Sequence, residues 1–202
     1  IWYRGTGIGT YTYQLLHHLK QGPEKESYRL FYPGEEYSGL DIGYRPDFLP
    51  LEENGDYWES YYLPKTLEQE AIDLYHVPQN GIGLPQKKVC RQVVTIHDLI
   101  PYIYPETVGR KYLQIFLQEM PRIMAEADGI ITVSENSKRD IRDIFAYPEE
   151  RIWVIYEAPE PVYHLLPAEP CSEELKERYG IHKKYILYVG GFGPRKNIRG
   201  LL

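Results

Sequence analysis

Short runs of apolar residues recur along the chain and alternate with segments in which apolar positions repeat every three or four residues. The continuous runs predict buried strands, because a strand that is covered on both faces has few polar positions. They lie at 72–77, 91–96, 129–133 and 153–155. The helical spacing predicts helices at 63–70, 109–127 and 135–145. Strands that alternate with helices are typical of a parallel sheet, so the sequence predicts an α/β, Rossmann-like fold with helices on both faces.

The first part of the chain has a weaker pattern. A glycine-rich turn, Arg4-Gly-Thr-Gly-Ile-Gly-Thr10, leads into apolar positions at helical spacing, which predict an amphipathic helix from Tyr11 to Leu19. A strand is expected at 28–32. Residues 35–57 are rich in Gly, Pro and acidic side chains, and we expect irregular structure there with one short strand near 44–49.

Proline has two distinct positions in the rest of the sequence. Pro121 lies inside the helix expected at 109–127 and should kink or divide it. The segment 157–171 is rich in proline, which is typical of a semi-rigid linker. We therefore expect two domains, an N-terminal one at 1–166 that includes the linker and the beginning of a second one at 167–202.

The C-terminal segment predicts a phosphate-binding turn. A short helix at 172–179 precedes an apolar run at 185–189, which predicts a further buried strand. This run leads into a glycine-rich turn that ends in Arg195 and Lys196. Glycines let backbone N–H groups approach an anion, and a following helix adds its partial positive charge. Contact with phosphate is favoured over a solvated surface pair for these two cations.

Composition narrows the class of protein. The 202 residues carry a net charge of −6, which argues against non-specific binding to nucleic acid. The only two cysteines, Cys90 and Cys171, are far apart and form no CxxC motif, which predicts neither a disulfide framework nor a zinc site and fits a reducing cytosol. No acidic cluster has metal-ligand spacing, and no apolar run reaches the roughly 20 residues of a membrane span.

Four positions lie at predicted carboxyl ends of strands, where parallel sheets bind ligands. They are His76, His97 with Asp98, Ser134, and the turn at 190–196. His97 and Asp98 either tie a loop together by hydrogen bonds or take part in chemistry, and both readings stay open. A structural role is favoured for His76. Ser134 is expected to cap the following helix, and no G-x-S-x-G motif surrounds it.

The glycines near the N-terminus allow two interpretations. Their pattern is G-x-G-x-G, whereas the dinucleotide fingerprint is G-x-G-x-x-G. The turn either contacts phosphate or lets a helix pack closely on a sheet. A nucleotide-dependent oxidoreductase is disfavoured, because Glu35 and Glu36 are late candidates for a ribose-binding acid.

Four motifs together carry a family resemblance. They are Gly5-Thr-Gly-Ile-Gly-Thr-Tyr11, His97-Asp-Leu, Ala127-Asp-Gly-Ile-Ile-Thr-Val-Ser-Glu-Asn-Ser-Lys-Arg-Asp140 and Tyr188-Val-Gly-Gly-Phe-Gly-Pro-Arg-Lys-Asn197. In this order the sequence resembles the retaining group 1 glycosyltransferases. These have the GT-B architecture, in which two Rossmann-like domains face each other across a cleft. The resemblance implies transfer of a sugar from a nucleotide-diphosphate donor to a hydroxyl group with retention, without a metal or other cofactor.

The resemblance also implies roles for individual residues. Gly7 and Gly9 match the first-domain loop near the donor phosphates. His97 matches the family histidine near the transferred sugar and the leaving group. Lys196 matches the lysine that neutralises the donor diphosphate, assisted by Arg195. His76, Asp98 and Ser134 are further candidates for the cleft. Many family members carry an arginine where this chain has Gly191, which puts one phosphate contact in doubt.

The leading hypothesis is therefore a glycosyltransferase of polysaccharide or glycolipid assembly, with a nucleotide-sugar donor and a glycan or lipid-linked acceptor. We expect it in the cytoplasm, with peripheral contact to the inner face of the membrane as an open alternative. The acidic donor-binding motif of the family would lie beyond Leu202. We therefore expect the chain to be the acceptor-side domain plus the start of the donor-side domain, and to be inactive alone. The alternative is a catalytically silent GT-B-like module that binds a glycan or a protein partner.

Overall fold

A computed structural model describes residues 6–19, 21–22, 28–33, 47–49, 58–165 and 168–202. By its contacts the chain divides into two units, Ile1–Tyr156 and Glu157–Leu202, and each is described by itself. The predicted domain border between residues 166 and 167 falls outside the described residues and stays a prediction.

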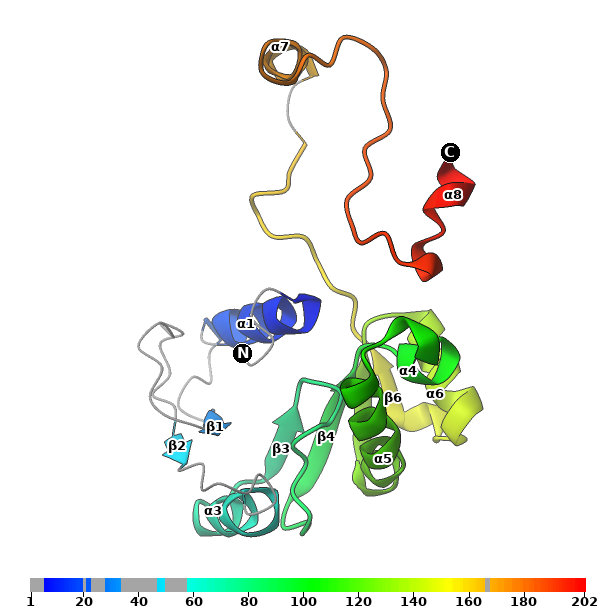
Figure 1. The fold of residues 1–202 in the computed structure, drawn as a ribbon. Helices are drawn as coiled ribbons and strands as arrows, with labels where there is room; N and C mark the ends of the chain where they lie inside the picture. The colour runs from blue at the N-terminus through cyan, green and yellow to red at the C-terminus, as the bar shows by residue number, and fades with distance from the viewer. Residues whose placement is uncertain (1–5, 20, 23–27, 34–46, 50–57, 166–167) are drawn as a thin grey trace. The chain divides into compact units, whose positions relative to one another are not determined.

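The first unit is organised around a four-stranded parallel sheet. Its strands are β3 (Leu74–Val77), β4 (Arg91–Ile96), β5 (Gly129–Thr132) and β6 (Ile152–Val154), hydrogen-bonded in that order. Each strand lies in one of the predicted apolar runs or overlaps it closely. The predicted parallel α/β sheet is thus confirmed (Figure 1).

One face of the sheet carries the main hydrophobic core. Val94, Ile96 and Ile130 have no solvent exposure and pack with apolar residues of α5 (Arg110–Glu126) and α6 (Glu135–Phe145). The residues of these two helices in this cluster are Tyr112, Phe116, Met120, Ile123, Met124, Ile141 and Phe145. Burying a side chain of this size stabilises the fold by about 1.5–3 kcal/mol, so this face anchors the unit.

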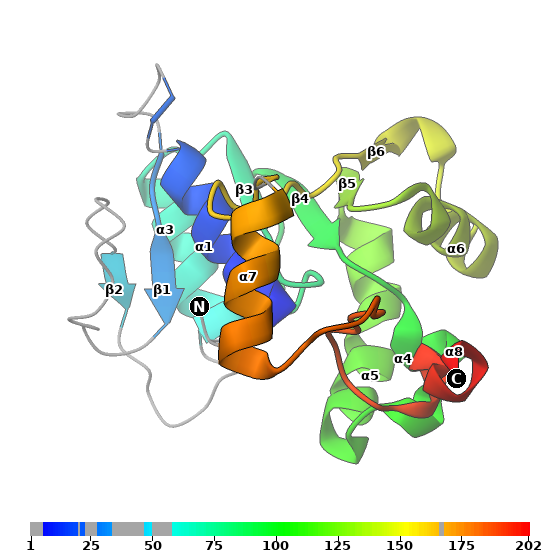
Figure 2. The ribbon, with the colours of Figure 1, turned by 90° about the horizontal axis from the view of Figure 1, so that it is seen from above.

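Helix α1 (Gly7–Leu19) lies over the opposite face (Figures 1 and 2). Tyr11 connects it to the sheet, with its hydroxyl 3.5 Å from Oγ1 of Thr95 in β4. Alternation along β4 explains this division, because Val94 and Ile96 point to the core while Thr95 points to α1. Helices on both faces are therefore confirmed.

One local prediction for this unit is wrong, and the division of α5, one of the two alternatives expected at Pro121, does not occur. Gly7 and Gly9 belong to the first turn of α1 and do not form a separate loop. The Thr6 hydroxyl accepts a hydrogen bond from Gly9 N–H at 3.2 Å and so starts the helix. Pro121 does not divide α5, which runs unbroken past it. Pro121 and Leu117, whose carbonyl loses its helical partner, are both exposed, so water can hydrate that carbonyl.

Several short elements complete the first unit. A π-helical turn (Trp58–Tyr62) leads into α3 (Leu63–Gln69), which falls within the predicted helix. The strands β1 (Phe31–Pro33) and β2 (Asp47–Leu49) pair in parallel. They overlap the strands predicted at 28–32 and near 44–49. The sequence did not predict α4 (Ile100–Ile103) or the 3-10 turns Pro105–Thr107 and Glu149–Arg151. Most of 35–57 lies outside the described residues.

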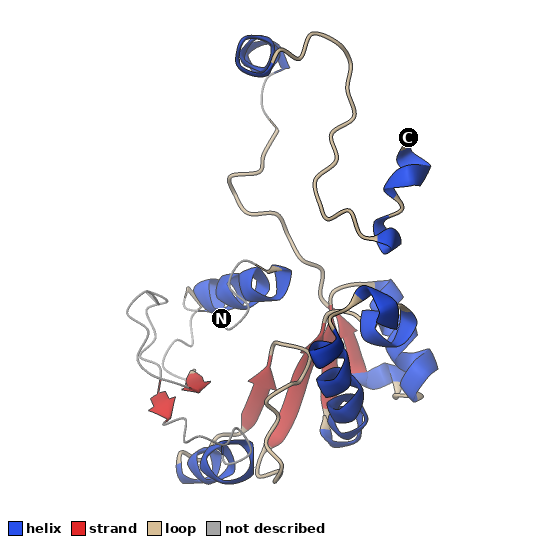
Figure 3. Cartoon of the chain, in the orientation of Figure 1, coloured by secondary structure: helices blue, strands red, loops and turns tan. Residues whose placement is uncertain are grey.

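The second unit contains helices and extended segments (Figure 3). Helix α7 (Ala168–Tyr179) begins earlier than predicted, within the expected linker. A 3-10 turn (Pro194–Lys196) precedes α8 (Ile198–Leu201). The strand predicted at 185–189 is wrong: that segment has no regular structure, and Ile186, Leu187 and Val189 are at least 74 % exposed. A strand needs a neighbouring strand for its hydrogen bonds, and none is described in this unit.

No helix among the described residues is both long enough and apolar enough to cross a membrane.

Candidate functional site at the carboxyl edge of the sheet

The structure brings the first-unit candidates to one edge of the sheet. His97 and Asp98 directly follow β4, and Ser134 follows β5. His76 is the third residue of β3, opposite Val93 of β4. Parallel strands end together at one edge of a sheet, which explains why residues far apart in sequence gather here.

His97, whose residue exposure is 9 %, is held by hydrogen bonds to three described residues. Its backbone N–H donates to Oδ1 of Asn80 at 2.8 Å, and its carbonyl accepts from the Ser137 hydroxyl at 2.9 Å. Its ring Nε2 lies 3.0 Å from the carbonyl oxygen of Pro78. A carbonyl oxygen can only accept, so Nε2 carries a hydrogen and the ring orientation is fixed.

The ring of Tyr11 covers His97 from helix α1. The two rings meet edge to face, with centroids 4.7 Å apart and an interplanar angle of 89°. Aromatic pairs favour this arrangement, which places the positive ring edge against a negative ring face. The contact ties the first turns of α1 to the carboxyl edge, so the N-terminal motif and the His-Asp motif share one site.

His76 forms a second histidine centre beside the first. Its Nε2 lies 2.8 Å from Oγ1 of Thr95, the residue whose hydroxyl also approaches Tyr11. Burial lowers the pKa of His76 from 6.5 to about 4. His76 is therefore uncharged at neutral pH, and the chain of hydroxyl groups from Tyr11 through Thr95 ends on a neutral imidazole.

Asp98 and Ser134 have clear local roles. Oδ1 of Asp98 accepts from the N–H of Ile100 at 3.0 Å and so shapes the turn after β4. Ser134 caps α6 as predicted: its Oγ accepts from Ser137 N–H at 3.1 Å. The Ser134 hydroxyl also donates to Oγ of Ser137 at 3.0 Å, which connects the cap to the residue that holds the His97 carbonyl.

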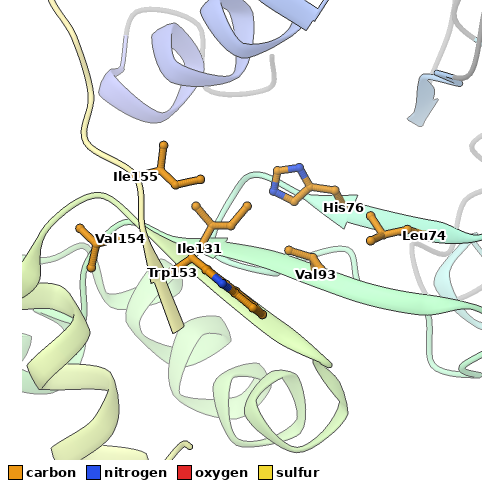
Figure 4. A pocket seen from close by; sticks show the side chains of 7 residues that line it. All are labelled: Leu74, His76, Val93, Ile131, Trp153, Val154 and Ile155. Carbon is orange, nitrogen blue, oxygen red and sulfur yellow. The ribbon is translucent and has the colours of Figure 1, made fainter. Parts of the chain in front are cut away.

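An apolar hollow of about 400 Å³ lies on the α1-facing side of the sheet (Figure 4). Its described lining residues come from all four strands and from Ile155, and His76 is the only ionisable residue among them. Residue Trp153 is 51 % exposed, and its indole lies over Gly129, where an added Cβ would meet the ring at 2.4 Å. Gly129 therefore lets the indole lie flat on the sheet.

The cations of the second unit stand on a short turn of their own. Arg195 and Lys196 end the 3-10 helix, and Asn197 follows with the left-handed φ of 47°. Both side chains are exposed, and neither forms an ion pair with a described residue. Their contact with donor phosphate stays a prediction, as do the roles expected for Gly7, Gly9 and His97.

Sequence analysis missed the residues that hold His97. The sequence did not single out Asn80, and Ser137 was expected only as part of the helix at 135–145. A signal for Asn80 was present, because Asn-Gly after a strand marks a turn with left-handed backbone, and Asn80 and Gly81 have φ of 57° and 72°. No group of three or more His, Cys, Asp or Glu side chains in the described residues is placed to hold a metal ion.

Comparison with known proteins identifies the family. The model of Glycosyltransferase Family 4 matches residues 5–158, which include the whole four-stranded sheet and the His97 contacts described above. This chain belongs to that family. The group 1 glycosyltransferase resemblance is thereby confirmed, together with its GT-B type N-terminal fold.

The relatives agree with this membership. The chain is 30 % identical over 215 residues to O-antigen chain mannosyltransferase B of Escherichia coli, an alignment that covers 98 % of this chain and 55 % of that protein. It is 28 % identical over 111 residues to O-antigen chain mannosyltransferase RfbU of Salmonella typhimurium, covering 55 % of this chain and 28 % of the relative. The chain thus spans about half the length of the first relative and less of the second.

Proposed function

We propose that the protein to which this chain belongs is a retaining glycosyltransferase. It transfers a sugar from a nucleotide-diphosphate donor to a hydroxyl group of a glycan or lipid-linked acceptor, in the assembly of a surface polysaccharide. The observation that carries the proposal is the family match across the sheet that fixes His97 at its carboxyl edge. The relatives' names give mannose as the first sugar to test.

The reaction sets the demands on the site. The bond between the anomeric carbon and the diphosphate oxygen breaks, and a bond forms from that carbon to the acceptor oxygen. The nucleoside diphosphate leaves with added negative charge, and its departing oxygen takes up the proton that the acceptor hydroxyl loses. A cation placed in advance near the leaving oxygen lowers this barrier by electrostatic stabilisation.

Within this proposal, Lys196 neutralises the leaving diphosphate and Arg195 assists. Exposed cations without an ion-pair partner among the described residues are available to a phosphate group. His97 acts beside the transferred sugar, with its ring orientation set by Pro78. The proposed reaction uses no metal or other cofactor, and these side chains supply the charge and the hydrogen bonds.

The proposed location is the cytoplasm, where nucleotide sugars are supplied, with peripheral contact to the inner face of the membrane when the acceptor is lipid-linked. A lipid-linked acceptor would present its sugar at a membrane surface. The test is recovery of full-length protein with vesicles that contain the acceptor lipid and with vesicles that lack it.

The activity test uses the full-length protein with a panel of nucleotide-diphosphate sugars that includes GDP-mannose. We expect transfer or slow donor hydrolysis with at least one donor. Lys196→Ala should lower kcat/KM by about 100-fold, because removing one preorganised charge contact to a developing anion costs on the order of 3 kcal/mol. Lys183→Ala, an exposed cation of the same unit, is the matched control and should change kcat/KM little.

The possible results of the activity test distinguish the proposals. No transfer and no hydrolysis with any donor would contradict the enzyme proposal, and acceptor binding without turnover would favour the silent binding module. Full activity in Lys196→Ala would remove only the role assigned to that lysine. Products of inverted configuration, seen by NMR of the new linkage, would remove the assignment of retention.

A further inference from the structure

Two buried side chains hold the main chain of His97 from opposite sides. Asn80, after β3, accepts from its N–H, and Ser137, in the first turn of α6 after β5, donates to its carbonyl. Both residues are almost fully buried, at 3 % and 6 % exposure. The segments that follow β3 and β5, the two neighbours of β4, therefore each contribute one side chain that binds the residue after β4.

Each of these side chains is itself fixed. Asn80 N–H donates to the Thr95 carbonyl at 2.9 Å, and its Nδ2 donates to the Tyr112 hydroxyl at 3.2 Å. Ser137 is held through Ser134, by the cap on its N–H and by the hydroxyl contact at 3.0 Å. Side chains that are locked by their own hydrogen bonds can hold a third residue to within a fraction of an ångström.

The backbone at Asn80 has a conformation that favours asparagine. Its φ of 57° is left-handed, where asparagine is tolerated far better than residues with larger or branched side chains. The next residue must be glycine: at Gly81 φ is 72°, and an added Cβ would lie 2.6 Å from Ile123 Cγ2. The tight turn also carries the Pro78 carbonyl that receives the ring Nε2.

We propose that Asn80 and Ser137 are positioning residues of His97 in the transfer reaction. This inference rests on the proposed function, because it assigns to His97 a role beside the transferred sugar. Neither residue needs to touch substrate. They restrain the peptide groups on both sides of His97, and with them the direction in which its ring enters the site. Misplacement of a catalytic group by about 1 Å can cost on the order of 100-fold in rate.

The first two variants each remove one of the side chains that hold His97, and the third controls for the bond to Tyr112 that Asn80→Gly also removes. Asn80→Gly keeps the left-handed backbone without strain and removes only the side chain. Ser137→Ala removes the opposite contact. Tyr112→Phe is the matched control, because it removes the far partner of Asn80 and leaves the bond to His97 in place.

Two measurements are made on each variant of the full-length protein. The first is kcat and donor KM for sugar transfer. We expect kcat to fall about 10- to 100-fold in Asn80→Gly and about 10-fold in Ser137→Ala, with KM changed less than about 3-fold. Tyr112→Phe only loosens Asn80 and should lower kcat by less than about 3-fold. A purely structural residue would lower the amount of folded enzyme without this split between kcat and KM.

The second measurement is NMR of His97, which is independent of turnover. In the wild type the ring should carry its hydrogen on Nε2, and the His97 amide should be protected from exchange. Asn80→Gly should speed exchange of that amide by about 10-fold and mix the ring tautomers. Ser137→Ala decides the matter if Asn80→Gly does not fold.

Wild-type kcat in both folded variants would overturn the positioning role. An unchanged His97 amide and ring signal in both would overturn it as well. If the wild type transfers no sugar, the proposed function fails, and the NMR result still decides whether these residues fix His97.

Discussion

The strand β5 of the first unit and residues 185–189 of the second carry the same kind of short apolar run, yet only one is a strand. Ile130 of β5 has no exposure and lies between β4 and β6, while Leu187 is 74 % exposed. An apolar run therefore provides the side chains of a buried strand but not the partners for its backbone hydrogen bonds. Neighbouring strands must supply those hydrogen bonds.

The largest expected effect comes from shortening one apolar side chain in each run to alanine. Ile130→Ala should lower the free energy of unfolding by about 3–4 kcal/mol, because it leaves a cavity between the sheet and its helices. Leu187→Ala should change it by less than about 0.5 kcal/mol, since that side chain is already hydrated. Urea unfolding followed by tryptophan fluorescence measures this, and all three tryptophans lie in the first unit. Equal losses in the two variants would contradict the description of 185–189.

A smaller change in the free energy of unfolding is expected with pH, because His76 is buried in the first unit. Its pKa is about 4 in the folded protein and 6.5 ordinarily, so between these values the unfolded chain binds a proton that the folded one does not. Stability should therefore fall as pH decreases from 6.5 to 4, by about 2–3 kcal/mol in all.

His76→Gln removes this titration and should flatten the dependence of the free energy of unfolding on pH in that window. Its matched control is His182→Gln, an exposed histidine of the second unit, which should leave the wild-type slope unchanged. An undiminished slope in His76→Gln would assign the pH dependence to other groups.

The smallest effect concerns the helix caps of the two units. Ser134→Ala should cost about 1 kcal/mol, because the cap hydrogen bond to Ser137 is lost. Asn197 precedes α8 without a side-chain cap bond, so Asn197→Gly, which keeps its left-handed φ, should cost almost nothing. Circular dichroism during urea unfolding compares the two, and a cost for Asn197→Gly as large as that for Ser134→Ala would contradict the difference.

The carboxyl-edge site was predictable to the extent that it depends on strand ends. The run at 91–96 placed His97 and Asp98 correctly, and Ser134 was correctly expected to cap a helix. The bonds from Asn80 and Ser137 to His97 span 17 and 40 residues of sequence. Local spacing contains no information on contacts of that length, so these partners could not be found from periodicity.

The order and type of the main strands and helices of the first unit follow from the sequence alone, because apolar periodicity and helix caps act within a few residues. It also carried the motifs that place the chain in its family. The three-dimensional structure was needed to show that 185–189 is not a strand and that Asn80 and Ser137 meet at His97. Those outcomes depend on hydrogen-bond partners and packing contacts that come from distant parts of the chain.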